Sequence, residues 1–257
     1  MRFLLIGDIV GRSGRNVIKE DLSHIKRELG INFTIANGEN AAGGNGITRD
    51  IARELFAAGI DVITMGNHVW NKKEVYNFIE QETRLIRPAN YPPGAPGAGM
   101  NVFVREGAAV CVINMSGRVY MSPLDCPFRK ADELLRQLSP DVKIVIVDFH
   151  AEASSEKIAM GWYLDGRVSA VCGTHTHVQT ADERILPEGT AYITDIGMTG
   201  PRDSVIGVDK DVVLEKFLTQ QPRRMEVASG PAQLNAVYID VDTDTGRAKK
   251  IERIFNL

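Results

Sequence analysis

The hydrophobic and polar positions in the first third of the chain alternate between strand and helix patterns. Residues 2–6 form a short apolar run, which predicts a buried strand. Apolar residues then recur every three or four positions up to Gly30, a residue type that often ends a helix, and this spacing predicts a helix. Its apolar positions are Val17, Ile18, Leu22, Ile25 and Leu29. Strand and helix in this succession predict parallel βαβ units.

The alternation continues through two further strands, predicted at residues 31–36 and 61–65. Between them, Thr48 has the position of an N-cap, and Gly59 follows the end of the helix that it begins. The apolar positions of this helix are Ile51, Leu55 and Ala58. A short helix is predicted over residues 73–79.

The rest of the chain predicts a more mixed arrangement. After a loop rich in Pro and Gly at 91–99, two apolar runs flank Glu106-Gly107 and predict a hairpin, so we expect the sheet system to become antiparallel there. Predicted strands lie at 101–105, 108–115, 142–149, 168–172, 190–194, 233–240 and 249–255, with one helix at 131–138 and another before residue 168. No repeat, low-complexity segment or linker interrupts the chain. The sequence therefore predicts one mixed α/β domain over residues 1–257.

Polar side chains with ligand chemistry follow several of the predicted strands. In open α/β sheets the carboxyl ends of strands line one crevice, so segments far apart in sequence can converge. The segments are Gly7-Asp8-Ile9-Val10-Gly11, Asn37-Gly38-Glu39-Asn40, Gly66-Asn67-His68, His150-Ala151-Glu152 and Gly173-Thr174-His175-Thr176-His177. From them we select two carboxylates, two amides and four of the five histidines as candidate site groups. Oxygen and imidazole ligands without thiolates suit Fe, Mn, Zn or a similar divalent ion.

The spacing of these residues along the chain suggests which of them bind metal and which one contacts the substrate. Glu39 can bridge two ions through its two oxygens, and two ions about 3.5–4 Å apart form a clamp for in-line displacement at phosphorus. In an extended backbone, residues two apart project to the same side, so we expect His175 and His177 to face the crevice together. Neighbours project to opposite sides, so we assign Asn67 to a metal and leave His68 free. A free imidazole beside the substrate can protonate the leaving oxygen.

Each group has an ordinary structural explanation when it is taken alone. Asp8 could cap a strand, Glu39 could belong to a turn, and His150 could be a buried structural histidine. Independent accidents rarely place every such group at a strand end, so the joint arrangement favours a metal site. His24 lies in a predicted helix outside these loops, and we interpret it as a surface or packing residue.

Other phosphate-binding and hydrolytic motifs are missing from the sequence. It contains no G-x-G-x-x-G, no G-x-x-x-x-G-K-[ST] and no G-x-S-x-G. The Gly43-Gly44-Asn45-Gly46 loop precedes a helix and could hold a phosphate, but glycine-rich turns are common and we favour a turn.

Composition and charge narrow the class of protein. The 257 residues are 44% hydrophobic and 25% charged, which is typical of a globular protein. The net charge of -3 provides no overall positive field, so there is no strong signal for duplex nucleic acid. No apolar stretch is long enough to cross a bilayer, so we expect no membrane partner. Cys111, Cys126 and Cys172 are odd in number and unpaired in spacing, which predicts a reducing, cytoplasmic compartment.

The Gly-Asp, Gly-Asn-His, His150 and Gly-Thr-His-Thr-His segments together resemble the calcineurin-like metallophosphoesterase superfamily. The whole chain resembles its YmdB-like bacterial branch. That match runs through Gly7-Asp8-Ile9-Val10-Gly11-Arg12, Asn37-Gly38-Glu39-Asn40-Ala41-Ala42-Gly43-Gly44 and Asp195-Ile196-Gly197-Met198-Thr199-Gly200-Pro201, so it covers nearly the full length.

The resemblance implies an α/β sandwich of two mixed β-sheets flanked by α-helices, and a dinuclear metal centre. It favours Fe or Mn for the two divalent ions, with Zn or Mg as further candidates. One ion would be held by Asp8, Glu39, Asn40 and His177, and the other by Glu39, Asn67, His150 and His175. Val10 stands where the wider superfamily has a histidine, and Glu39 replaces its usual bridging aspartate. These departures make the first site richer in oxygen and leave the metal's identity open.

The resemblance also implies phosphodiesterase activity toward 2′,3′-cyclic nucleotides, a small-molecule substrate. The hypothesis is that a hydroxide held between the metals attacks phosphorus in line, while His68 acts as the general acid. Two alternatives stay open: a phosphomonoesterase or protein phosphatase with the same centre, and a regulatory or RNA-associated metal-binding protein with vestigial activity. The sequence is compatible with a homo-oligomer.

Overall fold

Strand β1 (Arg2–Ile6) lies inside an eight-stranded mixed sheet, and all but the first of its side chains are buried. The computed structural model describes residues 1–256. β1 pairs in parallel with β3 (Phe33–Asn37), and β4 (Val62–Thr64) and β5 (Leu85–Ile86) continue the parallel half outward. On its other side β1 pairs antiparallel with β13 (Ala232–Val241). The sheet is completed by β2 (Asp8–Ile9), β12 (Met198–Pro201) and β14 (Ala248–Asn256).

The second sheet has six strands in the order β10-β11-β9-β8-β7-β6. The predicted hairpin is confirmed, because β6 (Met100–Arg105) and β7 (Ala108–Ser116) pair antiparallel. After the hairpin the pairing is parallel again, since β7, β8 (Ile144–His150) and β9 (Ala170–Thr174) run in the same direction. Helical crossovers return the chain to the same end before β8 and before β9, so these strands share one direction. The remaining strands are β10 (Arg184–Ile185) and β11 (Ala191–Ile193).

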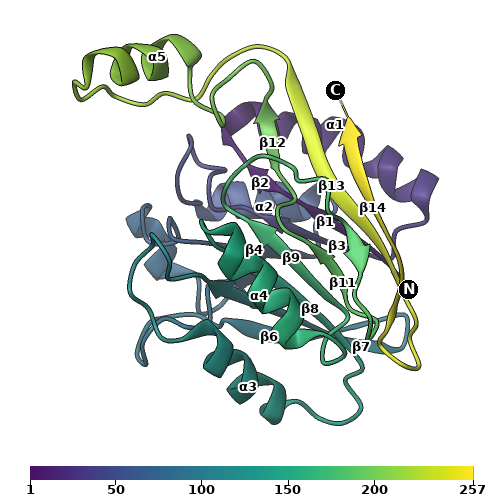
Figure 1. Ribbon diagram of the computed structural model, residues 1–257. Coiled ribbons are helices and arrows are strands. Elements are labelled where there is room, and N and C mark those ends of the chain that lie inside the picture. The colour runs from purple at the N-terminus through teal and green to yellow at the C-terminus, as the bar shows by residue number, and fades with distance from the viewer. Residues whose placement is uncertain (257) are drawn as a thin grey trace.

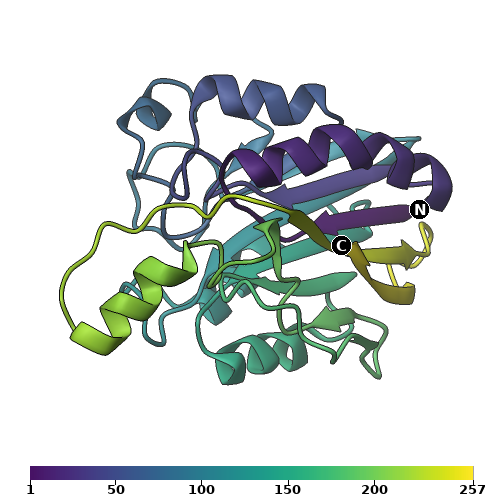
Figure 2. The same ribbon diagram turned by 90° about the horizontal axis from the view of Figure 1, so that it is seen from above.

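The two sheets pack face to face, and helices cover both outer faces (Figures 1 and 2). Alternate side chains of β1 serve the two sides: Leu4 and Ile6 pack beneath the first helices, whereas Phe3 and Leu5 pack against the second sheet. The helices on the first sheet are α1 (Gly11–Leu29) and α2 (Arg49–Ala57), and those on the second are α3 (Pro127–Gln137) and α4 (Ser154–Leu164). The predicted α/β sandwich of two mixed sheets flanked by helices is confirmed.

Several predicted helix ends have the expected chemistry. Gly30 ends α1 in the left-handed conformation at φ 61°. The Thr48 side chain caps α2 by accepting from the Ile51 backbone N–H at 3.4 Å. The short helix expected near residue 73 is the 3₁₀ helix η1 (Lys73–Asn77).

Helix α5 (Lys210–Thr219) has no counterpart in the sequence prediction. Asp209 caps it, yet only Val213 among its residues is buried, and the helix projects from the body of the molecule (Figures 1 and 2). Leu214, Phe217 and Leu218 are exposed on it. Over residues 1–256, no helix has the length and apolar character that a membrane span needs.

Candidate metal centre

The predicted site residues converge at one end of the two sheets. β3 ends at Asn37, β4 at Thr64, β8 at His150 and β9 at Thr174, and the loops that follow bring their side chains together across the gap between the sheets. The predicted residues at this place are Asp8, Glu39, Asn40, Asn67, His68, His150, His175 and His177. The fifth histidine, His24, lies outside them on the surface and forms an ion pair with Glu28, which confirms its predicted surface position.

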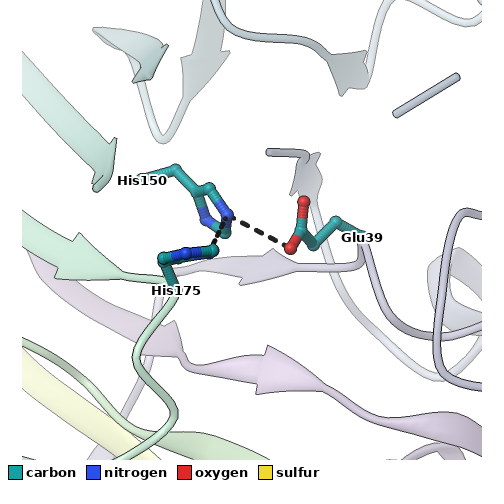
Figure 3. A group of neighbouring side chains, drawn as sticks. All are labelled: Glu39, His150 and His175. Atoms are coloured by element: carbon teal, nitrogen blue, oxygen red, sulfur yellow. Dashed lines mark hydrogen bonds and ion pairs between the residues drawn. The ribbon is translucent and has the colours of Figure 1, made fainter. Parts of the chain in front are cut away.

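One half of the site is centred on the Nε2 atom of His150. This atom lies 3.1 Å from Glu39 Oε1 and 3.0 Å from both Asn67 Oδ1 and His175 Nδ1. Figure 3 shows the glutamate and the two imidazoles pointing toward one another, and their ligand atoms all lie within 4.8 Å. A single imidazole N–H cannot donate to three groups at once, whereas a cation among them would satisfy all three.

The other nitrogen of His150 is held by a buried polar network. Nδ1 lies 2.9 Å from the hydroxyl of Thr174, which in turn donates to Asp148 Oδ1 at 2.7 Å. Asp148 also accepts hydrogen bonds from Thr64 and Asn37. Partners of this kind set the ring orientation of a ligating histidine and leave its Nε2 free to bind.

The second half of the site contains Asp8, Asn40 and His177. Asp8 is fully buried, and its Oδ2 accepts a hydrogen bond from the backbone N–H of His175 at 3.1 Å. Its Oδ1 is buried without a hydrogen-bond partner among the residues that the structure describes, 3.8 Å from His177 Nε2. A buried carboxylate oxygen in this state is costly unless a cation or a proton accompanies it.

Asn40 connects this half to His68. Its Oδ1 lies 2.8 Å from His68 Nδ1, and its Nδ2 lies 3.1 Å from His177 Nε2. The backbone N–H of His68 donates to Glu39 Oε2 at 3.0 Å. Asn67 and its neighbour His68 therefore contact different groups, the first His150 and the second Asn40.

Burial and the charges of neighbouring groups raise the pKa of some of these residues and lower the pKa of others. Burial raises the pKa of Asp8 to about 6, against the opposing effect of His177 and His150. Burial also opposes ionisation of Glu39, but the nearby His150 and His68 outweigh it and lower the pKa of Glu39 to about 2. For His150, burial is outweighed by the Glu39 carboxylate, which raises the pKa of the imidazole to about 9. Burial and the neighbouring His150 lower the pKa of His175 to about 3.

The donor set fits divalent metal ions. It combines two carboxylates, amide oxygens and imidazoles, and none of the three cysteines belongs to it. Gly66 leaves the room that this packing needs, since a Cβ atom there would overlap Glu39 and His150. Cations bound at these two places would account for the orphaned Asp8 Oδ1 and for the three groups around His150 Nε2.

The histidines at 175 and 177 face the site for a reason other than the one predicted. The extended backbone expected there is wrong, because His175 has φ 99° and His177 has φ 64°. A left-handed backbone is unfavourable for such residues and persists where surrounding contacts hold it. The contacts come from Asp195, whose Oδ2 accepts from the Thr176 backbone N–H at 3.1 Å and from its hydroxyl at 2.6 Å.

Sequence reasoning gave no role to three residues around this loop. Lys157 donates to Asp195 at 2.6 Å in a buried pair, and Glu152 Oε2 lies 3.1 Å from His175 Nε2. A signal for Lys157 exists in the sequence, since it lies three and seven residues before Met160 and Leu164, which places it on the buried face of α4. Its partner Asp195 lies in the Asp-Ile-Gly-Met segment, where no pattern indicates a contact 38 residues away.

A cavity of about 310 Å³ opens over the centre. Its polar side is formed by Glu39, Asn40, His68, Glu152, His175 and His177. Its other side is apolar and comes largely from the segment 206–208 and Val227. Polar groups that could hold a metal and an apolar wall thus line one space of a size suited to a small molecule.

Comparison with known proteins agrees with this geometry. A family model described as "YmdB-like protein" matches residues 4–254. A protein of Bacillus subtilis named 2′,3′-cyclic-nucleotide 2′-phosphodiesterase is 53% identical over 254 residues, which cover 99% of this chain and 96% of that protein.

Solved structures show the same likeness. A crystal structure of a phosphatase from Mycoplasma pneumoniae has a TM-score of 0.94 at 37% identity, covering 99% of this chain and 92% of that one. A putative 5′-nucleotidase from Staphylococcus aureus has a TM-score of 0.62 at 15% identity, covering 98% of this chain and 53% of that one. The second likeness concerns the fold alone.

Proposed function

The chain belongs to the YmdB-like protein family, and from this premise we propose that it is a metal-dependent phosphodiesterase that hydrolyses 2′,3′-cyclic nucleotides. The observation that carries the proposal is the convergence of Glu39, Asn67 and His175 on His150 Nε2 beneath a cavity of small-molecule size. The name of the Bacillus subtilis relative supports the class of substrate. We further propose that residues 1–257 work as a single domain.

The proposed ligands divide into two sets that share Glu39. Asp8, Asn40 and His177 complete one set, and Asn67, His150 and His175 complete the other. Asn40 would bind through its amide oxygen after a half-turn of the amide, which exchanges oxygen and nitrogen at nearly the same positions. The mixture of carboxylate, amide and imidazole groups without thiolates suits Fe, Mn, Zn or a similar divalent ion. We favour Fe or Mn over Zn or Mg because of the family resemblance.

Two divalent ions bound there would polarise the phosphoryl oxygens and activate a water molecule for attack. Within the chain, Glu39 Oε2 accepts a hydrogen bond from the backbone N–H of His68, and the Asn40 amide faces His68 Nδ1. After the half-turn, the amide NH₂ of Asn40 would donate to Nδ1 and leave the imidazole proton on Nε2. His68 also lines the cavity. With Nδ1 turned toward Asn40, Nε2 is the atom that would deliver a proton to the leaving ribose oxygen, which makes His68 the general acid.

The test is product release from 2′,3′-cyclic AMP by protein loaded with Mn²⁺ or Fe²⁺, with a chelator control and AMP as a monoester. We expect metal-dependent opening of the cyclic ester with AMP left intact. Turnover of AMP at a similar rate would favour a phosphomonoesterase, the alternative to which the name of the Mycoplasma relative points. A fully metallated protein that turns over neither ester would refute the proposed activity and favour a regulatory role.

We also infer a cytoplasmic location and a small-molecule partner. All three cysteines are free, and Cys111 and Cys172 are buried, as suits a reducing compartment. Self-association is compatible with the exposed apolar residues of α5. Sedimentation of the purified chain at two concentrations would test it.

A further inference from the structure

The cavity over the metal centre has two chemically different sides. Imidazole, carboxylate and amide groups form one side. Apart from Thr176, the rest of the lining is apolar and is formed by Val10, Gly44, Ile206, Gly207, Val208 and Val227. A phosphate group alone needs only the polar side. An apolar wall at the same opening indicates that the substrate carries an apolar part joined to its phosphate.

Ile206 is the unusual residue of this wall. Its φ is 49°, and its side chain is 52% exposed at the cavity. A β-branched residue in the left-handed region is a steric outlier, and glycine or asparagine would fit there more easily. Burial of the side chain within the fold does not offset the steric cost of this backbone conformation. A contact between the side chain and a ligand would explain why an isoleucine is present here.

The turn that presents Ile206 is held firmly. Val205 and Val208 exchange backbone hydrogen bonds of 2.9 and 3.0 Å around it, and the Ser204 hydroxyl accepts from the Gly207 N–H at 2.9 Å. The carbonyl of Ile206 accepts from His177 Nδ1 at 2.8 Å. The backbone of residue 206 thus orients a proposed metal ligand, while its side chain is left for the cavity.

The rest of the wall is braced from behind. Val208 pairs with Val227 through a backbone bridge, and Val227 packs so closely on Gly11 and Gly44 that a Cβ at either glycine would lie 2.9 Å from a Val227 methyl group. The wall is therefore a fixed apolar surface and not a loose loop side chain.

We propose that Ile206, supported by Val208 and Val227, is the contact surface for the nucleobase of the substrate. The cyclic phosphate then lies at the histidines, and the base lies on the methyl groups of this wall. This inference rests on the proposed function and adds the part of the substrate that is recognised. Since the wall offers methyl groups and no hydrogen-bonding side chain, it would hold bases by their apolar faces and distinguish them little by their edges.

The decisive variant is Ile206→Gly. Glycine suits the backbone at φ 49° and keeps the carbonyl that holds His177, so the change removes only the side chain. The measurement is kcat/KM for 2′,3′-cyclic AMP and for a base-free ribose 2′,3′-cyclic phosphate, with the metal content of each sample determined. We expect the ratio of the two values to fall about tenfold, the size of effect that a lost apolar contact in a pocket has on specificity.

Two comparisons complete the experiment. Ile206→Val should restore most of the ratio. Glu106→Gly also introduces a glycine at a residue with φ 49°, but in the turn between β6 and β7, outside the site. This control should leave the ratio as it is in the unaltered protein. An equal loss on both substrates in Ile206→Gly would overturn the inference and leave the proposed function standing. An unaltered, metallated protein that opens neither cyclic ester would overturn the proposed function, and the inference with it.

Discussion

Lys157 Nζ lies 2.6 Å from Asp195 Oδ2, and both side chains are almost completely buried. The same carboxylate accepts hydrogen bonds from the backbone and hydroxyl of Thr176 and, through Oδ1, from the backbone N–H of Gly197. The pair therefore ties α4 to the loop that carries His175 and His177. Because both oxygens of the buried Asp195 carboxylate accept hydrogen bonds, the ion pair holds that loop in its left-handed conformation.

Lys157→Met should destabilise the protein strongly, because it leaves the Asp195 carboxylate buried without its partner. We expect the free energy of unfolding in urea to fall by about 3–5 kcal/mol. Lys130→Met is the matched control: Lys130 pairs with Glu133 at 2.8 Å on the surface, and its loss should cost about 1 kcal/mol at most. Adding Asp195→Asn to Lys157→Met should recover part of the loss. Similar costs for the two lysine variants would contradict the role given to the buried pair.

His175→Ala should lower the metal content without unfolding the protein. His175 Nδ1 belongs to the group around His150 Nε2, so its removal opens one proposed binding site. We expect at least one of the two ions to be lost on dialysis, measured by elemental analysis, with the far-ultraviolet circular dichroism retained. His24→Ala is the control, since that imidazole is exposed and lies outside the centre. Equal metal content in the two variants would remove His175 from the ligand set.

The parts of the fold that sequence predicts well are those where local pattern and burial agree. β1 forms as expected at Arg2–Ile6, and all of its residues after Arg2 are apolar and buried. The site followed from the same logic, since parallel strands place their carboxyl ends together whatever their separation in sequence. Helix α5 was not predicted because its apolar residues are mostly exposed and do not form one buried face along the helix.

Other features depend on contacts that no local pattern encodes. The left-handed backbone at His175 and His177 is imposed by Asp195 and Ile206, which lie 18 to 31 residues further along the chain. The two-residue strands β2, β5 and β10 are too short to have a period, and they exist only because a neighbouring strand is present. The direction of the second sheet after its hairpin was likewise decided by the helical crossovers.

Asp182 should make the stability of the protein depend on acid pH. Although burial opposes its ionisation, hydrogen bonds from the Thr180 hydroxyl and from the hydroxyl and backbone of Thr194 outweigh burial and lower its pKa. A carboxyl group whose pKa is lower in the folded state contributes stability above its unfolded pKa of about 3.9 and loses that contribution as pH falls below it.

Asp182→Asn should therefore unfold more easily than the unaltered protein at pH 7, by about 1 kcal/mol or less because the group is partly exposed. The difference should shrink as the pH is lowered from about 4 toward 2. Urea unfolding over this range measures it. Thr180→Val removes one of the three donors to Asp182, so the pH-dependent part of its destabilisation should be smaller. It also removes the acceptor of the Asp195 backbone N–H, which adds a cost that does not vary with pH. If the difference in the free energy of unfolding between Asp182→Asn and the unaltered protein stays constant through the acid range, the hydrogen bonds to residue 182 stabilise the protein independently of its charge.

His68→Ala should slow the opening of a 2′,3′-cyclic nucleotide while leaving the metals bound. Its imidazole contacts Asn40 and lines the cavity, and it is not among the groups around His150 Nε2. Loss of a general acid typically lowers kcat by about 10²–10⁴-fold when the leaving group is a poor one such as a ribose alkoxide. A diester with a p-nitrophenolate leaving group needs little protonation and should be slowed much less. A general acid is therefore recognised by the contrast between the two substrates and not by the lower kcat alone. If both are slowed equally at unchanged metal content, His68 positions the substrate, and the acid must be sought elsewhere at the cavity, first at Glu152.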